Sequence, residues 1–393
     1  MKFAVRESFG VPPKGSVVKA SPAAEGGLRV LAAAQLTASD IAQWAALEDR
    51  AIEPNAYMSP HFVLPALRHL EPEAPVEIWF VQRHTGRTTQ LIGACAFVSR
   101  RWSKQCPFPH VSAYQSVHSY LSGPLLDRDH AAQAIERMLD FARDAPGRGL
   151  ALVLPCAEVS GPTASLMSGW ARRHASHVHC VDVRSRSFLV PSQSGPSALQ
   201  AALGSKFKDV SRNRRKLAEA GSVRWRAIRP SGPDTAFETF LQLEHGGWKA
   251  EGASSLLSKP AHGTFFREMA LRFADERRVW FTELSLNERV IASTSNLISG
   301  THGFAFKLGW DQEYRKYGVG ILNEVELVEN APDVCSDLES IDSGAEPGSF
   351  IDTMWPGRRQ LGSLILPLGR TGRALWRVAE SARMLKQQVQ GSE

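Results

Sequence analysis

The order of hydrophobic and polar residues along the chain predicts a mixed α/β protein in which one succession of elements occurs twice. Stretches with apolar residues every three or four positions predict helices, and stretches in which apolar residues alternate or run together predict strands. The first half should contain helices at about 39–51, 59–70, 131–143 and 163–174, and strands at about 76–83, 91–98, 112–120, 150–154 and 179–190. A Pro/Ser/Gly segment at 191–196 follows them and has the composition of a linker.

The second half repeats this succession. Helices are predicted at about 197–220, 235–245, 256–273 and 319–330, with a short helical turn near Phe350, and strands at about 223–228, 278–286, 289–299, 303–310, 338–342 and 361–366. A basic amphipathic helix at 373–390 closes the chain. We therefore expect a loose leader at 1–27, a first domain at 28–191, a second domain at 192–367 and a C-terminal helix at 368–393.

The strongest chemical signal is a glycine-containing turn between a predicted strand and a predicted helix. It reads Arg315-Lys316-Tyr317-Gly318-Val319-Gly320-Ile321. Glycines in such a turn let several backbone N–H groups approach phosphate oxygens at the positive end of the helix dipole. The pattern alone is common, so its position between strand and helix carries the prediction of a pyrophosphate-binding site.

The first half has no such turn at the corresponding place. Its chain reads Ser119-Tyr120-Leu121-Ser122-Gly123-Pro124-Leu125, and Pro124 has no N–H group to offer to an anion. We therefore expect the first half to form one wall of an acceptor cleft and to bind no phosphorylated ligand of its own.

The strand, the Arg-x-x-Gly-x-Gly turn and the helix together resemble the acyl-CoA-binding motif of the GNAT acyltransferases. The surrounding residues resemble the double-GNAT group named after the cellulose-biosynthesis protein CelD, a relative of the FemABX peptidyltransferases. The similar segments are 240–244, Trp248-Lys249, Gly252, Phe265-Phe266, Asn287-Glu288 and 342–346, all within about residues 195–366. The aromatic-Lys pair that this group often carries after its Gly-x-Glu is replaced here by Ser349-Phe350-Ile351.

This resemblance implies two tandem GNAT-like domains, each with a mixed, largely antiparallel sheet flanked by helices. It also implies acetyl-CoA or another acyl-CoA as co-substrate, and an amine acceptor such as an amino sugar or a polysaccharide precursor. In GNAT folds the pantetheine arm lies between two parallel strands, which here would be 303–310 and 338–342. The backbone of Lys307, Leu308 and Gly309 is then expected to pair with it.

Acyl transfer to an amine requires a base for the amine proton and an acid for the departing thiolate. Glu346 and Asp342 follow the second of those strands and are the candidate bases, with a solvated carboxylate and a turn cap as the respective alternatives. Tyr314 is the candidate acid, or a packing residue. Trp248 and Lys249 resemble the Trp-basic pair that would line the acceptor pocket, with a Trp that anchors a loop as the alternative.

Composition bounds these expectations. The chain has 393 residues, 43% hydrophobic residues and a net charge of +6, which suits two domains and an anionic partner such as CoA, nucleic acid or an acidic membrane. No apolar stretch is long enough to span a bilayer and the N-terminus lacks the centre of a signal peptide, which predicts a cytoplasmic protein. Five scattered cysteines without a Cys-x-x-Cys predict mostly buried thiols.

Two histidine-containing segments predict no site of their own. His174, His177, His179 and Cys180 carry zinc-binding groups, but a helix end followed by a strand with alternating faces would point them apart, so we expect no metal. His118, with Ser116, lies on a predicted strand without a nucleophile elbow, which favours polar packing over hydrolase chemistry.

Two basic segments leave other functions open. The basic residues of helix 197–220 suit a polyanion such as tRNA, which FemABX relatives use in aminoacylated form, although a solvated basic face is favoured. These residues are Lys206, Lys208, Arg212, Arg214, Arg215 and Lys216. The C-terminal helix could lie on an anionic membrane or pack on its own domain. A non-catalytic GNAT pair that serves as a scaffold in envelope-polysaccharide assembly is a further alternative, and the oligomeric state is left open.

Overall fold

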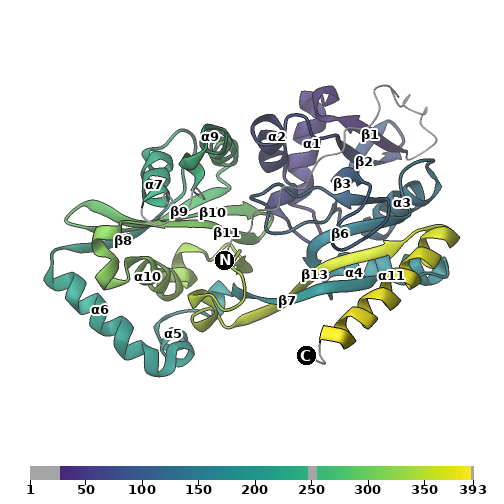
Figure 1. The fold of residues 1–393 in the computed structure, drawn as a ribbon. Helices are drawn as coiled ribbons and strands as arrows, with labels where there is room; N and C mark the ends of the chain where they lie inside the picture. Colours follow the sequence, from purple (N-terminus) through teal and green to yellow (C-terminus); the bar gives the residue numbers. More distant parts are fainter. Residues whose placement is uncertain (1–26, 247–254, 391–393) are drawn as a thin grey trace.

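The computed structural model describes residues 27–246 and 255–390, with side chains up to residue 383. Its strands form one continuous mixed sheet with helices on both faces (Figure 1). The described strands are β1 (Leu28–Ala32), β2 (Val76–Thr85), β3 (Thr88–Arg100), β4 (His110–Ala113), β5 (Leu125–Leu126), β6 (Ala151–Glu158), β7 (His179–Leu189), β8 (Val223–Ile228), β9 (Val279–Leu286), β10 (Arg289–Ser299), β11 (His302–Trp310), β12 (Ser340–Asp342) and β13 (Gly357–Pro367). The described α-helices are α1 (Ala38–Glu48), α2 (Pro60–His69), α3 (Ala131–Asp144), α4 (Pro162–Arg173), α5 (Pro196–Leu203), α6 (Phe207–Glu219), α7 (Thr235–His245), α9 (Pro260–Asp275), α10 (Val319–Val334) and α11 (Gly369–Gln390). Two short 3₁₀ helices, η6 (Gln312–Tyr317) and η7 (Phe350–Thr353), lie near the turn and near β13.

Local sequence signals account for several of these boundaries. The Asp234 side chain accepts a hydrogen bond from Ala236 N–H and begins α7, and Ser59 does the same for α2 ahead of Pro60. Asn287 and Glu288 both adopt positive φ and close the hairpin between β9 and β10. Helix and strand signals of this kind are legible in the sequence.

The sheet order is β1-β2-β3-β4-β6-β13-β7-β12-β11-β10-β9-β8, with β5 paired to β3. Antiparallel pairing predominates, and two pairs are parallel: β4 with β6 in the first half and β11 with β12 in the second. Each half thus contributes an antiparallel meander followed by a parallel strand. This arrangement confirms the mixed α/β class expected from the sequence.

The halves are joined by two strands that we call the shared ribbon, β7 from the first half and β13 from the second. β13 lies between β6 and β7, and β7 lies between β13 and β12. Strands from both sides of the linker-like segment at 191–196 therefore pair with each other. The chain changes composition at that segment, but the sheet is continuous across it.

Two sequence predictions are corrected by the structure. The strand predicted at 112–120 ends at Ala113, and residues 114–124 form a loop. In that loop Ser119 Oγ accepts from Ser116 N–H at 3.1 Å and Ser116 Oγ accepts from His118 N–H at 3.2 Å, so side chains replace the strand ladder. The single helix predicted at 197–220 is divided into α5 and α6 at Gly204, whose φ of +53° no regular helix accommodates.

Aromatic side chains from both halves share one core. The rings of Phe62 on α2 and Phe265 on α9 have centroids 5.4 Å apart, and Tyr57 lies 5.9 Å from Phe304 on β11. All four side chains are buried. The contact between the halves is therefore apolar at its centre, in keeping with a fixed arrangement of the two halves.

The C-terminal helix α11 packs on the first half. Trp376 is 2% exposed and belongs to a cluster with Phe108, Val153 and Ile365, whereas Val378 on the same helix is 69% exposed. In the described part of the chain, none of the helices combines the length and the apolar character needed to span a membrane.

Candidate functional site

The predicted phosphate turn lies where β11 leads into α10. The 3₁₀ helix η6 ends at Tyr317, Gly318 follows with a φ of +64°, and α10 begins at Val319. Gly318 N–H donates to Arg315 O at 3.0 Å. The following N–H groups, of Val319, Gly320 and Ile321, belong to the first turn of a 16-residue helix, where no intrahelical carbonyl can accept them. These groups and the helix dipole offer a site for a phosphate.

Positive charge surrounds this turn. Arg315 and Lys316 are exposed, and Asn213 on α6 lies 3.7 Å from where a Cβ on Gly318 would stand. Lys208, Arg212 and Arg215 line an open hollow on α6 together with Phe207 and Ser211. The basic residues of α6 therefore lie on the helix that flanks the turn.

Tyr314 lies at the same turn and away from the candidate bases. The Arg289 guanidinium is 5.8 Å from the centre of its ring, and the ring stacks on Tyr317 at 6.5 Å. In the described part of the chain, the ring contacts of Tyr314 are with Arg289 and Tyr317, and none is with Asp342 or Glu346.

The strands predicted to hold pantetheine are parallel neighbours that soon part. β11 and β12 pair only at His302–Ser340, Gly303–Ile341 and Phe304–Asp342. Beyond this point β12 ends, and β11 continues for six residues to Trp310. An extended ligand can therefore approach the backbone of β11 where β12 is missing.

A β-bulge in β11 falls at the point where the strands part. Across from β10, Ala305 pairs with Asn296 and Lys307 with Ser295, which leaves Phe306 as the additional residue. Lys307, Leu308 and Gly309 follow the bulge on this edge. α7 crosses closely at Gly309, where a Cβ would come 2.3 Å from Glu244 N, so only glycine fits there.

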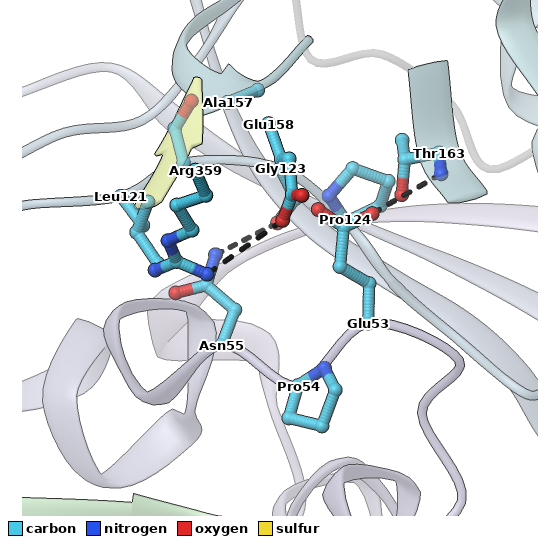
Figure 2. Close-up of a pocket in the computed structure, with 11 residues that line it drawn as sticks. Glu53, Pro54, Asn55, Leu121, Gly123, Pro124, Ala157, Glu158, Thr163 and Arg359 are labelled. Carbon is cyan, nitrogen blue, oxygen red and sulfur yellow. Dashed lines mark hydrogen bonds and ion pairs between the residues drawn. The ribbon is translucent and has the colours of Figure 1, made fainter. Parts of the chain in front are cut away.

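The corresponding place in the first half is filled by its own side chains. β4 and β6 also part after a short parallel pairing, but Glu53 occupies the N-terminus of α4, where it accepts from Thr163 N–H at 3.1 Å (Figure 2). Asn55 donates to Gly123 O at 3.4 Å across the same space. The cavity that remains is about 20 Å³, enough for a water molecule.

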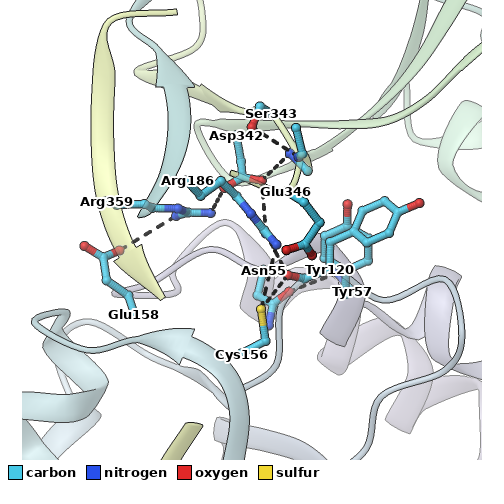
Figure 3. Close-up of polar contacts among 12 residues, drawn as sticks. Asn55, Tyr57, Tyr120, Cys156, Glu158, Arg186, Asp342, Ser343, Glu346 and Arg359 are labelled. Atoms are coloured by element: carbon cyan, nitrogen blue, oxygen red, sulfur yellow. Dashed lines mark hydrogen bonds and ion pairs between the residues drawn. The ribbon is translucent and has the colours of Figure 1, made fainter. Parts of the chain in front are cut away.

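Asp342 is the centre of a buried ionic cluster on the shared ribbon (Figure 3). Its carboxylate is 3.5 Å from Arg186 Nη1, forms an ion pair with Arg359, and accepts from Gly344 N–H at 2.8 Å. Asp342 is 3% exposed and the Arg186 side chain 1%. Arg186 and Arg359 are directly opposite each other on β7 and β13, so the carboxylate separates two like charges.

Glu346 differs from Asp342 in exposure. Its side chain is 70% exposed, and Glu346 Oε2 is 3.5 Å from Arg184 Nε. The structure thus places the two candidate bases at one end of the splay, one locked between guanidinium groups and one accessible to an incoming substrate. Trp248 and Lys249, predicted to line the acceptor pocket, lie outside the described residues.

Residues that sequence reasoning missed come mostly from the loop at 114–124 and from the shared ribbon. The ring of Tyr120 lies 3.1 Å from where a Cβ on Gly344 would stand, and its centroid is 5.9 Å from that of Phe306. Tyr120 O accepts from Arg186 Nη1 at 2.7 Å. The alternating Arg184-x-Arg186 of β7, with both side chains on one face of a strand, was the available signal.

The histidine cluster near residue 174 is used in local contacts. His174 Nδ1 is 2.9 Å from Trp170 O, and His179 Nδ1 is 3.4 Å from Glu380. No group of three or more metal-binding side chains occurs among the residues whose positions are given.

Comparisons with known proteins agree with this geometry. Residues 204–348 match the acetyltransferase (GNAT) domain. The matched segment runs from α6 through β12 and includes the turn, the bulge and both candidate bases. None of the curated proteins matches the chain.

Solved structures with a similar fold cover most of the chain. FemX has a TM-score of 0.55 at 8% identity over 89% of this chain and 99% of its own. L-PGS from Bacillus licheniformis has a TM-score of 0.51 at 10% identity, with 90% and 97% covered. A conserved protein of unknown function from Bacteroides thetaiotaomicron has a TM-score of 0.51 at 11% identity, with 85% and 98% covered. At these identities the likeness concerns the fold alone.

Proposed function

We propose that this protein is an acyl-CoA-dependent N-acyltransferase of the GNAT type. The second half would bind acyl-CoA, with the pyrophosphate at the N-terminus of α10 and the pantetheine arm along β11. The observation that carries the proposal is the parting of β11 and β12 at the bulge, next to a turn with Gly318 in the left-handed conformation. The match of residues 204–348 to the GNAT domain supports it.

The chemistry of transfer can be assigned to residues at the splay. A neutral amine attacks the thioester carbonyl, a C–N bond forms, and the C–S bond breaks. We assign Glu346 as the base that first removes a proton from the ammonium group, because its carboxylate is exposed and loosely paired. Asp342 holds the ribbon in place, since both of its oxygens are occupied. A backbone N–H beyond the bulge, at Lys307, would stabilise the oxyanion.

The proposed acceptor follows from the resemblance of the second half to the CelD-like double-GNAT group. An amino sugar or a polysaccharide precursor fits the CelD-like group, and Trp248 and Lys249 would contact it. The loop at 114–124 of the first half lies over Ala305 and Phe306 through Tyr120, which supports a first half that covers the acceptor side. A cytoplasmic location belongs to the same proposal.

A second candidate function is aminoacyl transfer from tRNA. It is favoured by the exposed Lys208, Arg212 and Arg215, which line the hollow on α6 beside the turn. Such binding depends on phosphate contacts and weakens steeply with salt. RNA binding that disappears in Lys208→Ala/Arg212→Ala/Arg215→Ala protein, without stabilisation by acyl-CoA, would favour this candidate over the first.

The test is thermal unfolding of the full chain with acetyl-CoA and longer acyl-CoAs. A ligand bound only by the folded state adds about 2.7 kcal/mol at a hundredfold excess over its Kd, so a clear rise of Tm is expected. Gly318→Asp should abolish the rise, because it places a carboxylate at the phosphate position.

Gly318→Asn is the matched control for that variant. Asparagine has nearly the same shape, tolerates the left-handed conformation and carries no charge, so it should retain most of the rise. Absence of a rise with every acyl-CoA, or an equal rise in both variants, would contradict the proposal.

A further inference from the structure

Two histidines, one from each half, form a hydrogen bond beside β11. His118 belongs to the loop after β4, and His262 belongs to the first turn of α9. His118 Nε2 and His262 Nδ1 are 3.0 Å apart, and the two rings are nearly perpendicular, with an interplanar angle of 89°. The residues are 144 positions apart in sequence, so only the packing of the two halves brings them together.

The pair lies against the bulge of β11. The ring of His118 stacks on Phe265 with centroids 5.6 Å apart and meets Phe306 edge to face at 6.2 Å. Phe306 is the bulge residue, immediately before Lys307. His118 is 6% exposed, whereas His262 is only half-buried. One imidazole thus faces the proposed thioester strand and the other is open to an incoming molecule.

The surroundings of the pair disfavour a positive charge. Burial lowers the pKa of His118 to about 2, with further lowering by Lys307, His262 and Lys259. Burial, Lys259 and Lys307 also lower the pKa of His262. These groups come from β11 and from the start of α9, and within the described chain no carboxylate contributes to either shift. Both imidazoles are therefore neutral near pH 7, with one ring donating to the other.

We propose that His262 and His118 form a proton shuttle between the attacking nitrogen and the departing sulfur. The proposal rests on the acyl-CoA function proposed above. An ammonium acceptor loses two protons in the complete reaction: one goes to Glu346 and then to water, and the second must travel from nitrogen to the CoA sulfur. The shuttle handles the second proton.

The proton passes in one direction, from the acceptor nitrogen through His262 and His118 to the sulfur, and each proton that leaves one atom is taken up by the next. After the C–N bond forms, His262 Nε2 accepts the proton of the positively charged nitrogen, and His262 Nδ1–H passes a proton to His118 Nε2. His118 Nδ1–H then donates to sulfur as the C–S bond breaks. Because burial and Lys307 destabilise an imidazolium here, the proton transfers are concerted and neither ring carries the charge. Both rings end neutral as the opposite tautomers. The starting tautomers are restored when His118 Nδ1 takes a proton from water and His262 Nε2 returns one to water.

In this scheme His262 is catalytic because it touches the acceptor nitrogen, and His118 completes the path to the sulfur. This division agrees with the geometry. The ring of His118 lies 6.2 Å from that of Phe306 on β11, and His262 is the more exposed of the two histidines.

The kinetic test uses hydroxylamine as the acceptor and acetyl-CoA as the donor, with hydroxamate measured as product. Hydroxylamine is largely neutral at pH 7, so its reaction needs the shuttle and not the first deprotonation by Glu346. His262→Gln should lower turnover by about 10²–10⁴-fold, and added imidazole should restore part of it in His262→Ala. Glu346→Gln should change turnover with this probe much less.

Two control variants make the test specific. His302→Gln removes a histidine at the far end of β11 and should leave turnover unchanged. His118→Asn retains a hydrogen-bonding group beside His262 but cannot relay a proton, so it should lose activity although His262 stays oriented. Wild-type turnover in His262→Gln or in His118→Asn, or no catalysis of this reaction by the wild type, would overturn the shuttle.

A binding measurement separates the shuttle from the acyl-CoA proposal itself. In full-chain protein with ¹⁵N-labelled histidine, acetyl-CoA should shift the ring resonances of His118 and His262 and leave those of His84, on the outer end of β2, in place. If acetyl-CoA raises Tm but shifts neither ring, the shuttle is wrong and the acyl-CoA function stands. If Tm does not rise at all, the acyl-CoA function is the one that fails.

Discussion

The two halves are alike up to the point where their parallel strands part, and they differ in the segments beyond that point. In the second half, β11 leads through Gly318 into the N-terminus of α10. In the first half, β4 leads into the loop at 114–124, which ends with Pro124. The second half leaves backbone N–H groups open for an anion at the N-terminus of α10. In the first half, Glu53 fills the space beyond the parallel pairing, where it accepts from Thr163 N–H of α4, the helix that follows β6 (Figure 2).

This difference shows how one fold position can serve two purposes. The first-half loop is not available for a phosphate, and its side chains reach across to the other half. Tyr120 packs near Gly344, and His118 meets His262. Under the proposed function, the duplicated position would supply a ligand site in one half and a cover for that site in the other.

The largest expected effect concerns the carboxylates that follow the two inner strands. Glu346 follows β12, and Glu158 ends β6 at the corresponding place. With an ammonium acceptor, Glu346→Gln should lower turnover by about 10²–10⁴-fold because the base is lost, and higher pH should restore part of it.

Glu158→Gln is the matched control from the first half. Glu158 is 3.7 Å from Arg359 and has no place in the proposed reaction, so turnover should hardly change. Equal losses in the two variants would end the assignment of catalysis to the second half.

The next effect concerns stability. Asp342→Asn keeps the shape of the side chain but takes from the buried Arg186 its ion-pair partner and leaves Arg359, which faces Arg186, with Glu158 alone. Removal of one partner from a buried ion pair costs about 3–5 kcal/mol, measurable as a lower free energy of unfolding in urea. Glu158→Gln, at a more exposed ion pair, should cost at most about 1 kcal/mol. A loss below about 1 kcal/mol for Asp342→Asn would show that the cluster does not depend on its charge.

A smaller effect compares one buried glutamate from each half. Burial raises the pKa of Glu48 and of Glu324 to about 7. Below about pH 4.5 each group is protonated in both states, whereas between about 4.5 and 7 the folded state holds the proton more tightly. The free energy of unfolding should therefore fall as pH rises through this window, by about 3 kcal/mol for a full shift from 4.5 to about 7.

Glu48 and Glu324 should not contribute equally to the pH dependence of the free energy of unfolding. Glu48 lies 3.6 Å from Arg278 Nη1, whereas the described hydrogen-bond partner of Glu324 is the hydroxyl of Thr294 at 2.5 Å. Glu324→Gln should flatten the pH dependence more than Glu48→Gln does, in urea titrations at several pH values. An unchanged slope in both variants would mean that neither group is held protonated by the fold.

Sequence patterns predict the local features of this protein and fail where distant segments meet. The order of elements and the turn at 315–320 are legible because each depends on neighbouring residues, such as the glycines and the apolar strand before them. The prediction of a strand after Ala113 is wrong. The hydroxyl groups of Ser116 and Ser119 accept hydrogen bonds from backbone N–H groups of the loop, and strand propensities do not take such side-chain bonds into account.

The residues of the candidate site also fall into two groups, those that the sequence predicts and those that it does not. The prediction of the phosphate turn follows from a contiguous motif, that of Lys307 to Gly309 from the resemblance to GNAT folds, and that of Asp342 and Glu346 from their place at and after the end of a strand. The partners of Asp342 come from β7 and β13, and the partner of His118 comes from α9. No periodicity in the sequence links such residues, because their contact is set by sheet order and by the packing of the two halves.

The shared ribbon has a consequence for the synthesis of the chain. β6 and β7 leave the ribosome early, but the strand that pairs with both of them, β13, begins only at Gly357. Until then β6 has one open edge and β7 lacks its β13 partner, and such open edges invite pairing with other chains. Folding to the native sheet must therefore wait until β13 has been synthesised, and a ribosome that stalls earlier in the second half would release a product prone to aggregation.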